Sequence, residues 1–170
     1  MNAGVVGYRM IPSWCLAVCN RLEAAGVRYV AVSGTAVVLH GLMRPSADLD
    51  IVISRAPDEV TRAMNALMCA GFMPSLPLPM SAVTVMRMFD SSQREVDVFV
   101  RYAVPFEELW TSSEKVQIDD SVVRVMSLEH LLRAKRISAR PHDLLDIDGL
   151  LALEKNRCAK APEAGERENR

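Results

Sequence analysis

Asp48-Leu49-Asp50-Ile51-Val52-Ile53 is the stretch that decides the fold. Its β-branched residues favour a strand, and successive side chains of a strand point to opposite faces. Asp48 and Asp50 therefore project together, while the apolar residues between and after them face a core. Two carboxylates on so apolar a strand are costly unless a cation compensates them, and Mg²⁺ takes carboxylate and phosphate oxygens. The alternative is a solvated strand end with two surface aspartates.

A third carboxylate favours the metal interpretation. Arg94-Glu95-Val96-Asp97-Val98-Phe99-Val100 is another alternating segment, with its valines on one face and Asp97 on the other. If this strand lies beside the first, Asp97 completes a cluster with Asp48 and Asp50. Three carboxylates can hold two metal ions ~3.5–4 Å apart. Glu95, nearer the strand start, is expected to be a surface charge.

Val32-Ser33-Gly34-Thr35 lies upstream, between a β-prone run and a short helix. Small residues at such a turn let backbone N–H groups approach a phosphate, and a helix N-terminus adds favourable partial charge. A strand-to-helix turn often contains Ser-Gly, so the signal is weak alone. The aspartate pair that follows strengthens it.

The rest of the chain alternates helical and extended patterns, which predicts a mixed α/β (α+β) domain with a partly antiparallel sheet. We expect helices over 11–22, 35–40, 57–68 and 105–110, with two more beginning at 127 and 141. We expect strands over 29–32, 48–54, 83–89, 96–102, 116–118 and 122–125. The Pro-rich stretch 73–79 is expected to be a loop. The charged stretch 154–170 predicts a disordered tail, leaving one domain over residues 1–153.

The composition sets outer limits on function. The 170 residues are half apolar and carry a net charge of −1, so any nucleic-acid binding would need a local basic patch. No apolar run reaches the ~18–20 residues of a membrane helix, and the N-terminus is not a convincing signal peptide. We therefore expect a cytoplasmic protein without a membrane partner. The four cysteines lack the spacing of a zinc site and read as reduced thiols.

Lys135 interrupts an apolar stripe. Leucines at 128, 131 and 132 predict an apolar residue at position 135, yet Lys occupies it. Either the lysine snorkels at the edge of the stripe, or it points into a cleft and meets triphosphate oxygens as a point charge. Arg140 could do the same. Asp143 and Asp146 share a helix face and either position these cations or cap the helix that begins at Pro141.

Taken together, these motifs resemble a known signature. Ser33-Gly34-Thr35-Ala36, Leu39-His40-Gly41, Arg44 and Asp48-Leu49-Asp50 are similar to the nucleotidyltransferase signature of the DNA polymerase β-like superfamily. The His-Gly and Arg between the turn and the aspartates resemble its AbiEii-type toxin branch. Residues 127–135 and 140–147 are similar to the distal motif of that branch, so the resemblance spans about residues 27–151. Ser33 stands where the family usually has Gly.

The resemblance implies a nucleotidyltransferase fold, with a mixed sheet, helices mainly on one face and C-terminal helices closing the cleft. It implies Mg²⁺-dependent transfer of a nucleoside monophosphate from an NTP to an acceptor hydroxyl. The acceptor implied for the toxin branch is the 3′ end of tRNA, with an antitoxin as partner. Two alternatives stay open: a small-molecule (antibiotic-type) nucleotidyltransferase, and a catalytically degenerate domain that binds nucleotide or a partner.

The roles expected from the sequence fall into two groups. The metal ligands and catalytic carboxylates are Asp48, Asp50 and Asp97, and Lys135 is the catalytic cation. The nucleotide-binding residues are Ser33, Gly34, Thr35, Lys135, Arg140 and Asp143.

Overall fold

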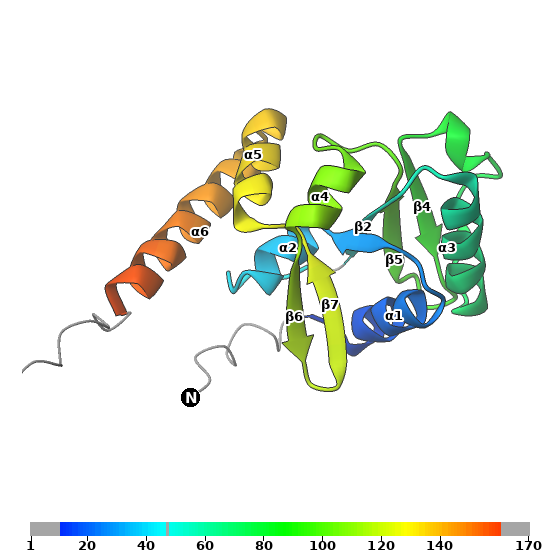
Figure 1. Ribbon diagram of the computed structural model, residues 1–170, viewed down its shortest axis with the longest axis horizontal. Helices are drawn as coiled ribbons and strands as arrows, with labels where there is room; N and C mark the ends of the chain where they lie inside the picture. The colour runs from blue at the N-terminus through cyan, green and yellow to red at the C-terminus, as the bar shows by residue number, and fades with distance from the viewer. Residues whose placement is uncertain (1–10, 47, 161–170) are drawn as a thin grey trace, which may run out of the picture.

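The computed structural model describes residues 11–46 and 48–160. These residues form a mixed sheet with helices packed around it (Figure 1). The helices are α1 (Ser13–Ala24), α2 (Ser33–Leu39), α3 (Pro57–Cys69), η2 (Met80–Ala82), α4 (Phe106–Ser112), α5 (Leu128–Ser138) and α6 (Pro141–Lys160). The strands are β1 (Tyr29–Ala31), β2 (Leu49–Ile53), β3 (Met73–Pro74), β4 (Val85–Phe89), β5 (Glu95–Phe99), β6 (Glu114–Ile118) and β7 (Ser121–Val125). The expected α/β class is confirmed.

The sheet has seven strands in the order β3-β4-β5-β2-β1-β7-β6. β2 pairs in parallel with β5 and antiparallel with β1, so the strand of the aspartate pair lies at the centre. β4 and β5 form an antiparallel hairpin, as do β6 and β7. All three residues of β1 are buried, as expected for a central strand covered on both faces. The predicted adjacency of the two acidic strands is confirmed.

The helices end and pack as their sequences predict. α1 and α3 contact each other, and they reach the sheet at β7 and β2 respectively. Gly26 follows α1 with φ of 66°, and Gly41 follows α2 with φ of 98°. Glycine reaches this left-handed region without a steric cost, which explains why both helices end there.

The C-terminal helices form a separate pair at one end of the molecule (Figure 1). α5 packs on α6 and on α2. Ser127 is the N-cap of α5, and its hydroxyl accepts a hydrogen bond from the His130 backbone N–H. This pairing sets α5 beside the N-terminal turn of α2, where the aspartate strand also begins.

Three sequence-based expectations need correction. Within the expected loop 73–79, Met73 and Pro74 form β3 on the edge of β4, and a strand this short leaves no periodic pattern. The turn η2 was also missed. The expected tail from residue 154 is helical as far as Lys160, and Arg157 in this stretch donates a hydrogen bond to the His40 carbonyl over 2.7 Å. Residues 161–170 lie outside the described part. No helix among the described residues is long and apolar enough to cross a bilayer.

Candidate active site

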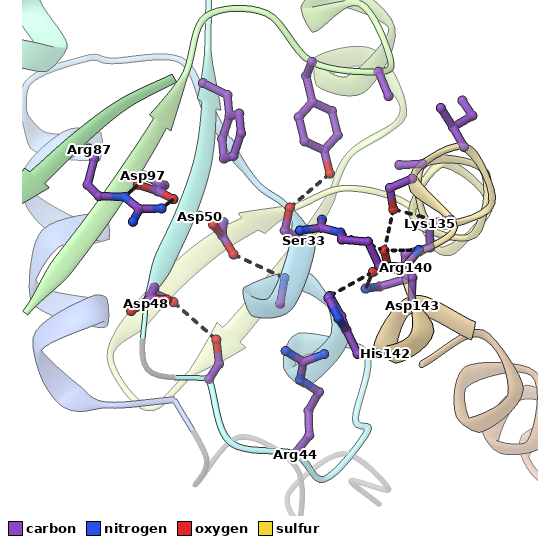
Figure 2. Close-up of a pocket in the computed structure, with 18 of the residues that line it drawn as sticks. Ser33, Arg44, Asp48, Asp50, Arg87, Asp97, Lys135, Arg140, His142 and Asp143 are labelled. Atoms are coloured by element: carbon purple, nitrogen blue, oxygen red, sulfur yellow. Dashed lines mark hydrogen bonds and ion pairs between the residues drawn. The ribbon is translucent and has the colours of Figure 1, made fainter. Parts of the chain in front are cut away.

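The acidic wall of the site comes from two neighbouring strands. The register of β2 and β5 places Asp50 directly opposite Asp97. Asp48 precedes β2 and is exposed, whereas Asp97 is only 8% exposed. Figure 2 shows Asp48, Asp50 and Asp97 on the same side of one pocket. The strands thus bring Asp50 beside Asp97, and Asp48 lines the same pocket, while the three-carboxylate metal site stays a prediction.

The turn into α2 holds Asp50 in place. The Gly34 backbone N–H donates to Asp50 Oδ2 over 3.2 Å. Ser33 has φ of 49°, a left-handed conformation that favours Gly, and its Oγ lies 3.2 Å from the Tyr102 hydroxyl. Such a φ strains a residue with a Cβ. The hydroxyl contact helps to hold the turn in this conformation.

Thr35 does not fill its expected role as a nucleotide contact. Its side chain is buried, where Oγ1 donates to the Asp48 carbonyl over 3.2 Å and accepts from the Asp50 N–H over 3.1 Å. It ties α2 to the start of β2. Thr35 therefore positions the aspartate pair and does not face the pocket. His40 is also buried, and its Nε2 lies 2.8 Å from the Met126 carbonyl oxygen.

Asp97 is engaged by an arginine that the sequence analysis did not identify. Arg87 Nε and Nη2 donate to the two carboxylate oxygens of Asp97 over 3.0 and 3.1 Å. Arg87 also lies 2.6 Å from Glu95, which sits inside β5 and is not the loose surface charge expected. Within the described residues, no three His, Cys, Asp or Glu side chains are grouped so that they could hold a metal. The two-metal cluster remains a prediction.

The Asp50 carboxyl has a raised pKa. Burial raises the pKa of its carboxyl to about 7, and the neighbouring charges of Asp97, Asp48 and Glu95 add to the effect. The Gly34 N–H opposes it only in part. A buried carboxyl that ionises this reluctantly gains from a bound cation, so Asp48 and Asp50 fit Mg²⁺ as a pair of hard oxygen donors.

The opposite wall of the pocket is basic and comes from α5 and α6. Lys135 is 5% exposed, and its Nζ donates to Asp143 over 2.9 Å and to Asp146 over 2.7 Å. Arg44 Nη1 reaches the same oxygen of Asp146 over 2.5 Å. Lys135 therefore lines the pocket, as expected, but as part of a buried ion network. The snorkelling alternative is wrong, because the ammonium is buried among carboxylates.

Asp143 anchors this network. Burial alone would raise the pKa of the Asp143 carboxyl, but hydrogen bonds from Ser138 and Lys135 hold this pKa below its usual range. Arg140 also donates to Asp143, from its backbone N–H and from Nε. Asp143 therefore positions Lys135 and Arg140, and its saturated oxygens make it a poor direct contact for a nucleotide, contrary to its expected role.

The pocket between the two walls has a volume of about 410 Å³. Figure 2 shows Asp48, Asp50 and Asp97 on one side, Asp143 with Lys135, Arg140 and His142 on the other, and Ser33 and Arg44 between them. Phe99 and Tyr102 close one end, with ring centroids 5.4 Å apart in an edge-to-face pair. The residues that line it are Ser33, Gly34, Arg44, Pro45, Ser46, Asp48, Asp50, Arg87, Asp97, Phe99, Tyr102, Ala103, Ala134, Lys135, Ile137, Ser138, Arg140, His142 and Asp143.

Three solved structures are similar in fold to this chain. Lincosamide antibiotic adenylyltransferase LnuA, in its lincomycin-bound form, matches with a TM-score of 0.63 at 18% identity, over 83% of this chain and 96% of that one. An antigenic nucleotidyltransferase-like protein from Paracoccidioides brasiliensis matches with a TM-score of 0.56 at 17% identity, over 83% and 75%. A candidate nucleotidyltransferase from Thermotoga maritima matches with a TM-score of 0.57 at 14% identity, over 85% and 90%.

The chain has the nucleotidyltransferase fold. Searches of protein-family models and of curated proteins find no match to the sequence. These structural neighbours share the fold and do not single out the AbiEii branch.

Gly34 offers a first test of whether this pocket binds a triphosphate. A Cβ at this position would lie 3.3 Å from Arg44 Nη2, 3.4 Å from Ser46 Oγ and 3.6 Å from Asp50 Oδ2, in the space between the walls. We expect Gly34→Ala to weaken NTP binding at least tenfold while leaving the thermal midpoint nearly unchanged. Isothermal titration with each NTP and Mg²⁺ measures the first effect and calorimetry the second. Unchanged affinity would mean that no phosphate approaches this turn.

The raised pKa of Asp50 gives a second test, made in EDTA. The folded carboxyl titrates near 7 and the unfolded one near 3.8, so the folded state binds more protons between these values. The contribution of Asp50 to wild-type stability should therefore fall as the pH rises from 4 to 7. Asp50→Asn removes the ionisation, so its stability relative to wild type should rise over the same interval by about 2–4 kcal/mol. Urea denaturation at several pH values measures this. Parallel curves for the two proteins would contradict the raised pKa.

Proposed function

We propose that this protein is a Mg²⁺-dependent nucleotidyltransferase that moves a nucleoside monophosphate from an NTP to an acceptor hydroxyl. The observation that supports this best is the arrangement of one pocket. An aspartate pair, a backbone N–H at a helix start and a wall of cations surround a volume of about 410 Å³. This is the combination that a triphosphate with its metal requires.

Each group has a distinct role in the proposed reaction. Asp48 and Asp50 would hold Mg²⁺, which would neutralise charge on the triphosphate. The Gly34 N–H donates to Asp50 Oδ2 in the structure, and it would turn to a phosphate oxygen once Mg²⁺ took up that carboxylate. Arg44, Lys135 and Arg140 outnumber the two carboxylates that they contact, those of Asp143 and Asp146, so this side of the pocket would keep one net positive charge for the β- and γ-phosphates.

In the transfer step, the acceptor oxygen forms a bond to the α-phosphorus. The bond from that phosphorus to the bridging oxygen of the β-phosphate breaks, and pyrophosphate leaves. Asp97, which lies beside Asp50, would accept the hydroxyl proton. Positioning and charge neutralisation account for most of the catalysis in such a site.

The acceptor divides the proposal into two candidates. The motif resemblance to the AbiEii branch supports the 3′ end of tRNA, with the protein acting as a toxin held in check by an antitoxin. The apolar part of the pocket favours a small molecule instead. Phe99 and Tyr102 line it, and Ile137 stands at its edge with 62% of its surface exposed. A lincomycin-bound neighbour of the same fold is compatible with this second candidate.

An acceptor screen separates the two. The protein is incubated with Mg²⁺ and each α-³²P-labelled NTP, with either total cellular RNA or a panel of hydroxyl-bearing antibiotics. Label that enters intact RNA, but not RNA whose 3′ ends were oxidised with periodate beforehand, supports the tRNA acceptor. Label in an antibiotic supports the small-molecule acceptor. Label in neither, with NTP still bound in the pocket, would favour a binding domain without turnover.

A further inference from the structure

Arg87 is the one part of the acidic wall that the proposed reaction leaves unexplained. It stands on β4, next to β5 on the side away from β2, and the strand register pairs it with Asp97. Its guanidinium makes two parallel hydrogen bonds to Asp97, of 3.0 and 3.1 Å, and a contact of 2.6 Å to Glu95. It lines the pocket together with Asp48 and Asp50.

The register shows why a cation is needed at this point. Leu49 pairs with Val96 and Asp50 with Asp97, so Asp48 comes opposite Glu95 just before the ladder begins. Four carboxylates thus share one face of β2 and β5 over two neighbouring positions. Within the part of the chain that the structure describes, Arg87 is the cation paired with the two on β5.

We propose that the Arg87 guanidinium takes the place of a second metal ion beside Asp97, so that the protein works with a single Mg²⁺ at Asp48 and Asp50. This inference rests on the proposed function for that single ion. Arg87 also orients Asp97, because a bidentate pair uses one lone pair on each carboxylate oxygen and leaves the others facing the pocket.

The geometry separates this role from that of an ordinary surface ion pair. Asp97 is 8% exposed and Arg87 occupies both of its oxygens, so a metal that bound there would have to displace the whole guanidinium. The pair is also built across a continuous antiparallel ladder from Val85 to Phe89, which fixes the distance between the two backbones. The planar guanidinium of arginine can donate to both carboxylate oxygens at once, so it suits this site better than the single ammonium of a lysine.

Counting bound metal tests the inference without any turnover. Mn²⁺ binding to the full chain is measured by electron paramagnetic resonance of free Mn²⁺, without nucleotide. We expect one ion per wild-type chain and two per Arg87→Met chain. Arg87→Lys, which keeps the charge, should bind one. Arg94→Met should also bind one, because Arg94 pairs with Asp90 at the turn of the same hairpin, outside the pocket.

The remaining outcomes are equally decisive. If Arg87→Met does not fold because of carboxylate repulsion, the double variant Arg87→Met/Glu95→Gln removes one charge and should still bind two ions. Two ions on the wild type, or one on both Arg87→Met variants, would overturn the inference while leaving the proposed function intact. If Asp48→Asn/Asp50→Asn keeps the wild-type count, the metal site of the proposed function fails, and this inference fails with it.

Discussion

Replacing Lys135 with Met is expected to destabilise the fold by about 3–5 kcal/mol, the scale on which removing one partner breaks a buried ion pair. The methionine keeps the length and the apolar stem but deletes the ammonium. Asp143 and Asp146 would then be left buried without the cation that both contact, at 2.9 and 2.7 Å. Urea denaturation at neutral pH measures the loss. Because α5 and α6 form one wall of the pocket, NTP binding should fall with it.

Two further variants make this expectation specific. Lys115→Met changes an exposed lysine on β6 and should leave the stability within about 0.5 kcal/mol of wild type. The triple variant Lys135→Met/Asp143→Asn/Asp146→Asn removes the uncompensated charges and should recover much of the lost stability. If Lys135→Met is as stable as wild type, the buried network does not hold α5 to α6 as described.

Asp50→Asn should reduce nucleotidyl transfer by at least about 10²–10³-fold, as expected when one electrostatic contact to the reacting charge is lost. The change preserves the shape of the side chain but removes a metal ligand from the centre of the sheet. The thermal midpoint should hold or rise, because repulsion from Asp97 is relieved. Steady-state rates of pyrophosphate release measure the effect. Asp58→Asn, on the exposed first turn of α3, is the matched control and should retain wild-type rates.

A near-wild-type rate in Asp50→Asn would show that the aspartate pair serves only the fold. A rate loss accompanied by an equal loss of folded protein would show the same thing. The account requires a lost rate in a protein that remains folded, and the two measurements together distinguish these cases.

The centre of the site could be predicted because its signals are local in the sequence. Asp48 and Asp50 lie on one short strand, and the alternation of that strand assigns them to one face. The turn at Gly34 is adjacent to a strand and a helix that both have clear patterns. Asp97 was placed correctly because its own strand alternates in the same way and the sheet pairs the two in parallel.

The partners of these residues could not be predicted, because they depend on tertiary pairing. Arg87 reaches Asp97 through the register of a hairpin, and a shift of one residue would have turned it to the other face. Arg44 meets Asp146 across more than a hundred residues of sequence. For Lys135 the sequence left two readings of Asp143 and Asp146, as its partners or as helix caps, and the packing of α5 on α6 decides for the first.

The measurement that tests the central claim most directly is the fate of the two ends of the triphosphate. The protein is incubated with Mg²⁺, the acceptor found in the screen, and an NTP labelled either at the α- or at the γ-phosphate. The account predicts that the α-label enters the acceptor while the γ-label leaves as pyrophosphate. Transfer of the γ-label to the acceptor, with nucleoside diphosphate as the second product, would contradict it.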